Sequence, residues 1–172
     1  MPRRSKRVEE TQIWGGLLLV HKFVSKELAA DLEREVGISL IWYDTLLVLA
    51  ESEDGRMRLQ DLEQRVLHSQ SGMTRLIDRM AAAGHVTREK AGDDRRGVHA
   101  RITPEGMHAF RRAAPTFVNG VHRYFLSHLS EEEKKVIRGA LARVSRTLLP
   151  GDPWWESRNQ QNQADRPHSK NS

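Results

Sequence analysis

Three segments in the middle of the chain read SQSGMTRLIDRMAAAGHV (69–86), GDDRRG (92–97) and TPEG (103–106). The first predicts a helix that begins at Ser69 or Ser71, both good N-cap residues, and that ends before Gly84. The second has a glycine at each end and turn-forming residues between them, which is typical of a hairpin loop. In the third, Thr103 can cap a helix whose first residue is Pro104.

Two predicted strands, 86–91 and 98–102, flank the GDDRRG loop. A short extended segment at 57–59 and a helix at 60–67 precede the 69–83 helix. Two helices, a hairpin and a new helix in this order form a winged helix-turn-helix, which reads double-stranded DNA. We therefore expect a mainly α fold (α+β winged helix-turn-helix) with about six helices and a wing of two or three strands.

The predicted 69–83 helix has two unlike sides. On a helical wheel, the apolar side that would anchor it consists of Met73, Leu76, Ile77 and Met80. Hydroxyl and amide groups near the helix start can reach base edges or phosphates, and arginine can bind guanine with two hydrogen bonds. The residues of this helix that we expect to contact DNA are Ser69, Gln70, Ser71, Thr74, Arg75 and Arg79.

The hairpin loop carries two further basic residues, Arg95 and Arg96, at its predicted tip. An arginine there can enter a narrow minor groove, where the negative potential is enhanced. Asp94 is close enough to pair with one of them and hold it in place. Residues 69–101 contain seven Lys or Arg and four Asp or Glu, so much of the chain's net charge of +5 is in this segment.

These motifs together resemble the multiple-antibiotic-resistance regulator (MarR) family, above all through DRRG at 94–97 and TPEG at 103–106. The similarity is tightest over residues 59–106, and the helical layout fits over about 13–149. The resemblance implies a homodimer, a pseudo-palindromic operator, and release from DNA by a small ligand that is often anionic or aromatic.

By position, Arg96 matches the arginine that this family places in the minor groove, and Asp94 matches the residue that braces it. One departure is Gln60, which stands where the family usually opens a helix with Ser or Thr. The common Leu-Ala pair is also changed, because Glu63 follows Leu62. Neither change falls on the predicted reading face.

We expect a basic flexible arm at residues 1–10, one domain at 11–150 and a polar, disordered tail at 151–172. The arm is either a solvated tail or a segment that touches DNA. Within the domain, helices at about 11–36 and 104–149 flank the winged helix-turn-helix at 39–103. Their wide apolar faces exceed what one small winged helix needs, so we expect them to form a dimer interface.

Local signals within these outer helices are also clear. Pro115 should kink or disturb the long helix predicted for 104–128. Ser130 and Glu133 form a capping box at the start of the last helix.

Four residues could line an effector pocket: Trp14, His21, Trp42 and Tyr43. Such pockets are largely apolar with few polar groups. Each of the three aromatic residues could instead pack in the core, and His21 could be a core or interface histidine, a ligand donor or a pH sensor.

The chain has no cysteine, which excludes disulfides, thiolate catalysis and thiol redox sensing. None of the eight histidines has a tight metal-ligand spacing, so we expect no metal, no cofactor and no enzymatic activity. The absence of a long apolar run or signal-peptide core predicts a cytoplasmic protein without a membrane partner. We therefore expect a sequence-specific transcriptional regulator, a homodimeric repressor that a small ligand releases from its operator. The alternative is a winged-helix module for protein interaction or non-specific DNA binding without a ligand switch.

Overall fold

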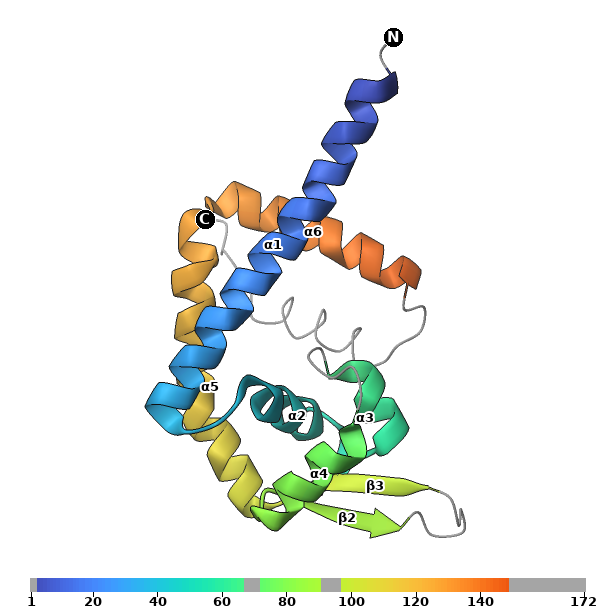
Figure 1. Cartoon of the computed structure of the whole chain (residues 1–172), viewed down its shortest axis with the longest axis vertical. Helices are drawn as coiled ribbons and strands as arrows, with labels where there is room; N and C mark the ends of the chain where they lie inside the picture. Colours follow the sequence, from blue (N-terminus) through green and yellow to red (C-terminus); the bar gives the residue numbers. More distant parts are fainter. Residues whose placement is uncertain (1–2, 67–71, 91–96, 149–172) are drawn as a thin grey trace, which may run out of the picture. The chain divides into compact units, whose positions relative to one another are not determined.

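The computed structural model describes residues 3–66, 72–90 and 97–148, and these fold into six α-helices, two short 3-10 helices and three strands (Figure 1). The chain divides into two compact units, Met1–Ser127 and His128–Ser172, and each is described by itself. The elements of the first unit are α1 (Arg3–Val36), α2 (Leu40–Ala50), η1 (Glu53–Gly55), β1 (Arg56–Arg58), α3 (Leu59–Arg65), α4 (Met73–Ala82), β2 (Val86–Lys90), β3 (Val98–Ile102), α5 (Pro104–Tyr124) and the start of η2 (Leu126–His128); α6 (Glu131–Leu148) belongs to the second. The predicted mainly α fold with a small winged sheet is confirmed.

Helix α2 forms the centre of the first unit. It packs against α1, α3, α5 and the sheet, which matches a helix that is apolar on most sides. The buried residues of α2 are Leu40, Tyr43, Asp44, Thr45, Leu46, Val48 and Leu49. The Tyr43 ring stacks between Phe110 and Phe117 of α5, with ring centroids 5.6 and 4.4 Å away. These aromatic contacts fix α5 against the core.

Helix α1 lies along α5 and begins at Arg3 rather than near Thr11, so residues 3–10 of the expected arm are part of a helix. The C-terminal half of α1 is anchored by Leu28 and Leu32, which are buried. Helix α5 runs unbroken through Pro115 and ends at Tyr124, earlier than the predicted 128. Pro115 is exposed, so the carbonyl group that its missing N–H leaves without a helical partner can bond water.

A buried carboxylate joins the two long helices. Asp31 of α1 is 4% exposed and accepts a hydrogen bond of 2.8 Å from the Tyr124 hydroxyl of α5. Its other oxygen pairs with Arg34, and the oxygen that accepts from Tyr124 also lies 3.6 Å from Arg123. The hydrogen bond from Tyr124, followed by that from Arg34, lowers the pKa of Asp31 against the opposing effect of burial. This cluster holds the C-terminal end of α5 to α1.

The sheet has the strand order β1-β3-β2, and both pairs are antiparallel. Ala100 in the central strand is fully buried. On the exposed side, Glu89 of β2 accepts a hydrogen bond of 2.6 Å from Arg101 of β3, and its other oxygen lies 3.7 Å from Arg56 of β1. One carboxylate therefore links all three strands.

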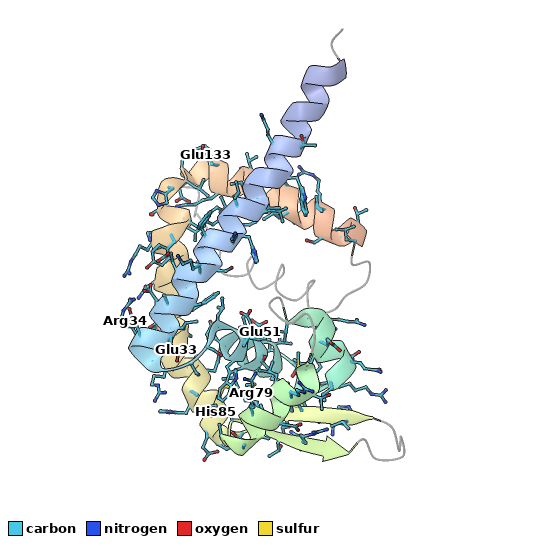
Figure 2. The ribbon with its side chains drawn as sticks, in the orientation of Figure 1. Glu33, Arg34, Glu51, Arg79, His85 and Glu133 are labelled. Atoms are coloured by element: carbon cyan, nitrogen blue, oxygen red, sulfur yellow. The ribbon has the colours of Figure 1, made fainter. Side chains whose placement is uncertain are left out.

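The turn between α4 and β2, which contains His85 (labelled in Figure 2), is packed directly on the start of α5, because the His85 carbonyl bonds the Thr103 amide at 3.1 Å and leaves no room for a Cβ on Gly106. Gly84 has φ of 80° and ends α4 as predicted, and the amide of His85 bonds back to the Met80 carbonyl at 2.9 Å. The Thr103 hydroxyl accepts a hydrogen bond from the Gly106 amide and donates one to the Gly84 carbonyl. The predicted cap of α5 is confirmed, and it also holds the end of α4.

In the second unit, the predicted capping box of α6 is confirmed. The Ser130 amide donates to Glu133 at 2.8 Å, and the Glu133 amide donates to the Ser130 hydroxyl at 3.2 Å. The hydrogen bond from the Ser130 amide, followed by the Ser130 side chain, lowers the pKa of the Glu133 carboxyl group. The amides of Ser130 and Glu133, which have no backbone partner within the helix, are therefore both hydrogen-bonded.

We predict that Gly106→Ala destabilises the protein by about 1–3 kcal/mol, because a Cβ at this position would overlap the backbone carbonyl of His85. Thermal unfolding provides the measurement. Gly139→Ala is the matched control, since a Cβ there would be 3.6 Å from Arg143, an ordinary contact, and alanine favours the helix. Equal melting temperatures for the two variants would contradict this account.

We predict that Asp31→Asn lowers stability at neutral pH by about 1–3 kcal/mol, because it removes charge-assisted hydrogen bonds. A carboxylate with a lowered folded pKa stabilises above its unfolded pKa, about 3.9, and this contribution is lost as pH falls through the folded pKa. The gap between wild type and Asp31→Asn should therefore narrow in urea titrations below about pH 4. Tyr124→Phe should reproduce part of the loss. A gap that does not change with pH would exclude a charged Asp31 as its cause.

Candidate DNA-binding interface

Helix α4 begins at Met73, and its N-cap is Gly72 with φ of 96°. The prediction that Ser69 or Ser71 caps this helix is therefore wrong. The chain enters α4 through a left-handed residue, a conformation that glycine adopts without strain, and this N-cap glycine has no side chain to bond the first amides. A helix N-terminus favours phosphate.

The side of α4 that packs inward is the one predicted from sequence. Its four buried residues are Met73, Leu76, Ile77 and Met80. Ile77 and Met80 are 0% exposed, and the helix packs on α3 and β2. The polar residues Thr74, Arg75 and Arg79 are exposed. A firmly anchored helix therefore presents a polar face to solvent.

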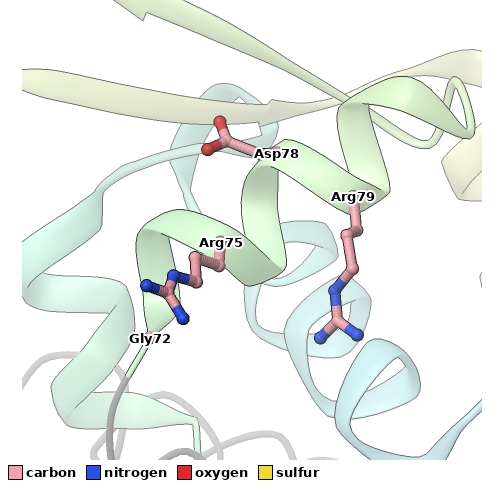
Figure 3. Close-up of a pocket in the computed structure, with 4 residues that line it drawn as sticks. All are labelled: Gly72, Arg75, Asp78 and Arg79. Carbon is pink, nitrogen blue, oxygen red and sulfur yellow. The ribbon is translucent and has the colours of Figure 1, made fainter.

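Arg75 and Arg79 extend from successive turns of α4 on the side of the helix away from Asp78, as Figure 3 shows. With Gly72 and Asp78 they line an open hollow of about 890 Å³. The long guanidinium side chains are one helical turn apart, which suits contacts to neighbouring base edges or phosphates along a groove. This hollow is the main feature of the exposed face of α4.

Asp78 points to the other flank of α4 in Figure 3, toward the sheet. There Arg88 of β2 donates a hydrogen bond to its carboxylate. Arg88 also lines a smaller hollow of about 260 Å³, together with Arg58, Gln60 and Thr74. Neither Arg88 nor Arg58 is among the residues predicted from sequence to contact DNA. Basic residues alternate along the strands, and this pattern was a signal in the sequence. It does not show, however, which acidic residue each of them pairs with.

Helix α3 begins at Leu59, and its N-cap residue is Arg58, whose side chain does not cap the first amides of the helix. Gln60, which we expected to open this helix, lies in its first turn. The residue that caps this helix is therefore Arg58 and not the predicted Gln60. Arginine cannot accept hydrogen bonds from the first amides, as Ser or Thr would.

Six of the predicted DNA-contact and bracing residues lie outside the described residues, and they are Ser69, Gln70, Ser71, Asp94, Arg95 and Arg96. The strands that carry the predicted loop are confirmed, and their last pair joins Lys90 to Val98. Thr74, Arg75 and Arg79 lie together on α4. The assignment of these residues to DNA contact stays a prediction.

The four candidate pocket residues do not meet at one place. Trp14 and His21 are exposed on α1. Trp42 is half-buried and meets the edge of His85 with ring centroids 5.5 Å apart, whereas Tyr43 is 3% exposed within the aromatic stack of α2 and α5. Each therefore has a separate environment within the chain.

Within residues 3–66, 72–90 and 97–148, no three His, Asp or Glu side chains are grouped so that they could hold a metal ion. The helices in these ranges include none with the length and hydrophobicity of a membrane-spanning segment.

A sequence model of the MarR family matches residues 36–97. AbsC, a MarR family transcriptional regulator from Streptomyces coelicolor, is 33% identical, covers 81% of this chain and 94% of its own, and has a TM-score of 0.70. Sco3205, a MarR family regulator from the same organism solved in complex with DNA, is 28% identical, with 84% and 91% covered and a TM-score of 0.72. The transcriptional repressor MprA of Escherichia coli is 27% identical over 66% of this chain and 61% of its own length.

A winged helix-turn-helix with an arginine-bearing second helix defines the class of DNA-binding transcriptional regulators. The chain belongs to the MarR family of such regulators, which confirms the resemblance inferred from its sequence. The family and its structural relatives are regulators of transcription rather than enzymes.

Proposed function

We propose that this protein is a homodimeric repressor that binds a pseudo-palindromic operator and is released by a small ligand. One observation carries the proposal: α4 buries one face and exposes Arg75 and Arg79 on successive turns of the other. An anchored helix with long, directed donors is suited to the major groove, which is about 12 Å wide. The proposal of repression, rather than activation, of transcription is supported by the E. coli relative MprA, which is named a transcriptional repressor.

In the proposed complex, α4 reads base edges through Arg75, Arg79 and Thr74, with Ser69, Gln70 and Ser71 at its approach. Arg95 and Arg96 of the wing reach the flanking minor groove, and Asp94 braces Arg96. In the dimer, the α4 helix and wing of each protomer then contact the operator on the same face of the DNA. A dimer of this kind needs half-sites about 34–36 Å apart, one turn of the duplex.

The dimer is supported by apolar side chains that the single chain leaves in solvent. Those of α1 are Ile13, Trp14, Leu17, Leu18, Leu19, Val20 and Phe23, and those of α6 are Val136, Leu141, Val144 and Leu148. Ile13 is 75% exposed. The α1 residues are spread around the helix, and a helix that is apolar on all sides is normally enclosed. A second copy can enclose it.

The proposed effector is a small anionic or aromatic compound, with Trp14, His21, Trp42 and Tyr43 as the candidates to line its site. Trp14 and His21 are exposed in one chain, so a second copy could complete a pocket around them. The effector must bind more tightly to the conformation that does not fit DNA, since only differential affinity shifts the equilibrium. The protein would act in the cytoplasm, where the DNA is.

The decisive experiment compares binding to the DNA upstream of the protein's own gene with binding to random DNA of equal length, together with the mass in solution. We expect a dimer with a strong preference for the upstream DNA. Small carboxylates and aromatic compounds are then screened for loss of the shifted band. Equal affinity for both DNAs would favour a non-specific or interaction module instead.

We predict that Arg75→Ala and Arg79→Ala each weaken operator binding by about 1–3 kcal/mol and relax specificity at the base pair contacted. Arg111→Ala, an exposed arginine on α5, is the control for loss of one positive charge. Gel-shift titrations on the operator and on single-base variants give the measurement. If the control weakens binding as much as either α4 variant, net charge rather than contact explains the effect.

We predict that Arg96→Ala weakens binding to all duplexes alike and flattens the dependence of log affinity on log salt by about one unit, because a wing arginine neutralises the backbone field. A titration at several salt concentrations measures the slope. An unchanged affinity and slope would remove Arg96 from the interface.

A further inference from the structure

An acidic side chain lies on the helix that is proposed to meet DNA. Asp78 follows Arg75 by three residues and precedes Arg79 by one in α4, and its side chain is 50% exposed. It is among the residues that line the hollow of these two arginines, although its carboxylate points to the other flank of the helix. A carboxylate near the phosphate backbone repels it, so an unpaired Asp78 would oppose the attraction that the arginines supply.

The structure gives this carboxylate a partner in the wing. Arg88 of β2 donates to Asp78, and Figure 3 shows Asp78 on the flank of α4 away from Arg75 and Arg79. Asp78 lines the larger hollow and Arg88 the smaller one, so the ion pair lies between the two. The pair also links the reading helix to the strand that leads into the wing.

The pair contributes little to folding by itself. Arg88 is 37% exposed and Asp78 50%, and exposed ion pairs add little stability. The helix is already anchored by its four buried apolar side chains. The position of this pair is better explained if Arg88 neutralises the charge of Asp78 and orients its carboxylate than if the pair serves to stabilise the fold.

We propose that Arg88 is a positioning residue for DNA binding: it neutralises Asp78, keeps its carboxylate off the face of Arg75 and Arg79, and fixes β2 against α4. This inference rests on the proposed DNA-binding function. In this role Arg88 acts through Asp78 and does not itself bind a phosphate. Removing Arg88 therefore harms binding only while Asp78 keeps its charge.

The experiment is a double-mutant cycle of wild type, Arg88→Ala, Asp78→Asn and Arg88→Ala/Asp78→Asn, with Arg111→Ala as the control for lost charge. Each protein is titrated with the upstream duplex and with random duplex at several salt concentrations, and its thermal unfolding is recorded. We expect Arg88→Ala to lose about tenfold in affinity, a 1.4 kcal/mol effect. Asp78→Asn should bind as well as wild type, and the double variant should recover to within about threefold.

Other outcomes overturn the inference in distinguishable ways. A double variant as weak as Arg88→Ala, with a salt slope lower by about one, would make Arg88 a direct phosphate ligand. A clear loss in Asp78→Asn alone would place Asp78 on a base, for instance as an acceptor from cytosine. Parallel loss of melting temperature in the variants would indicate a structural role. If the wild-type protein binds neither duplex, both the proposed DNA-binding function and this inference are contradicted.

Discussion

The carbonyl group of His85 fixes how the reading helix is held. It accepts a hydrogen bond of 3.1 Å from the Thr103 amide, and it lies so close to Gly106 that no side chain fits between. The Thr103 hydroxyl bonds the Gly84 carbonyl from the same turn. The end of α4 and the start of α5 are therefore joined through backbone groups, which cannot adapt as flexible side chains do. A change in the angle of α5 must move α4 with it.

This rigid junction lowers the entropy that the arginines of α4 must lose on binding, because the helix that carries them is already fixed. Arg75 and Arg79 are long and flexible, and ordering such side chains costs conformational entropy. The helix beneath them is held by buried Met73, Leu76, Ile77 and Met80, so only the side chains need to be ordered on binding. The opposing charge of Asp78 is already paired with Arg88. Most of the organisation that DNA binding requires is thus present in the folded chain.

Features that depend on residues within one turn could be predicted from the sequence. These include the Thr103 cap, the Gly84 stop, the Ser130–Glu133 box and the buried side of α4. Features that join distant residues could not. A carboxylate in a helix normally suggests a solvated position, and only the fold brings Tyr124 to Asp31 or Arg88 to Asp78. The start of α4 was misjudged because serine is the commoner cap, and the left-handed φ of Gly72 leaves no pattern in the sequence.

The two halves of α1 differ in what stabilises them, and this difference connects association with DNA reading. The C-terminal half is held by Leu28, Leu32 and the Asp31 cluster, and its end bonds α5 through Thr116 and Glu35 at 3.0 Å. The N-terminal half contains two adjacent glycines and exposed apolar side chains, so propensity alone stabilises it weakly. In the proposed dimer, the second copy supplies the missing burial. A ligand that alters this association would act on α1, then on α5, and through the His85 carbonyl on α4.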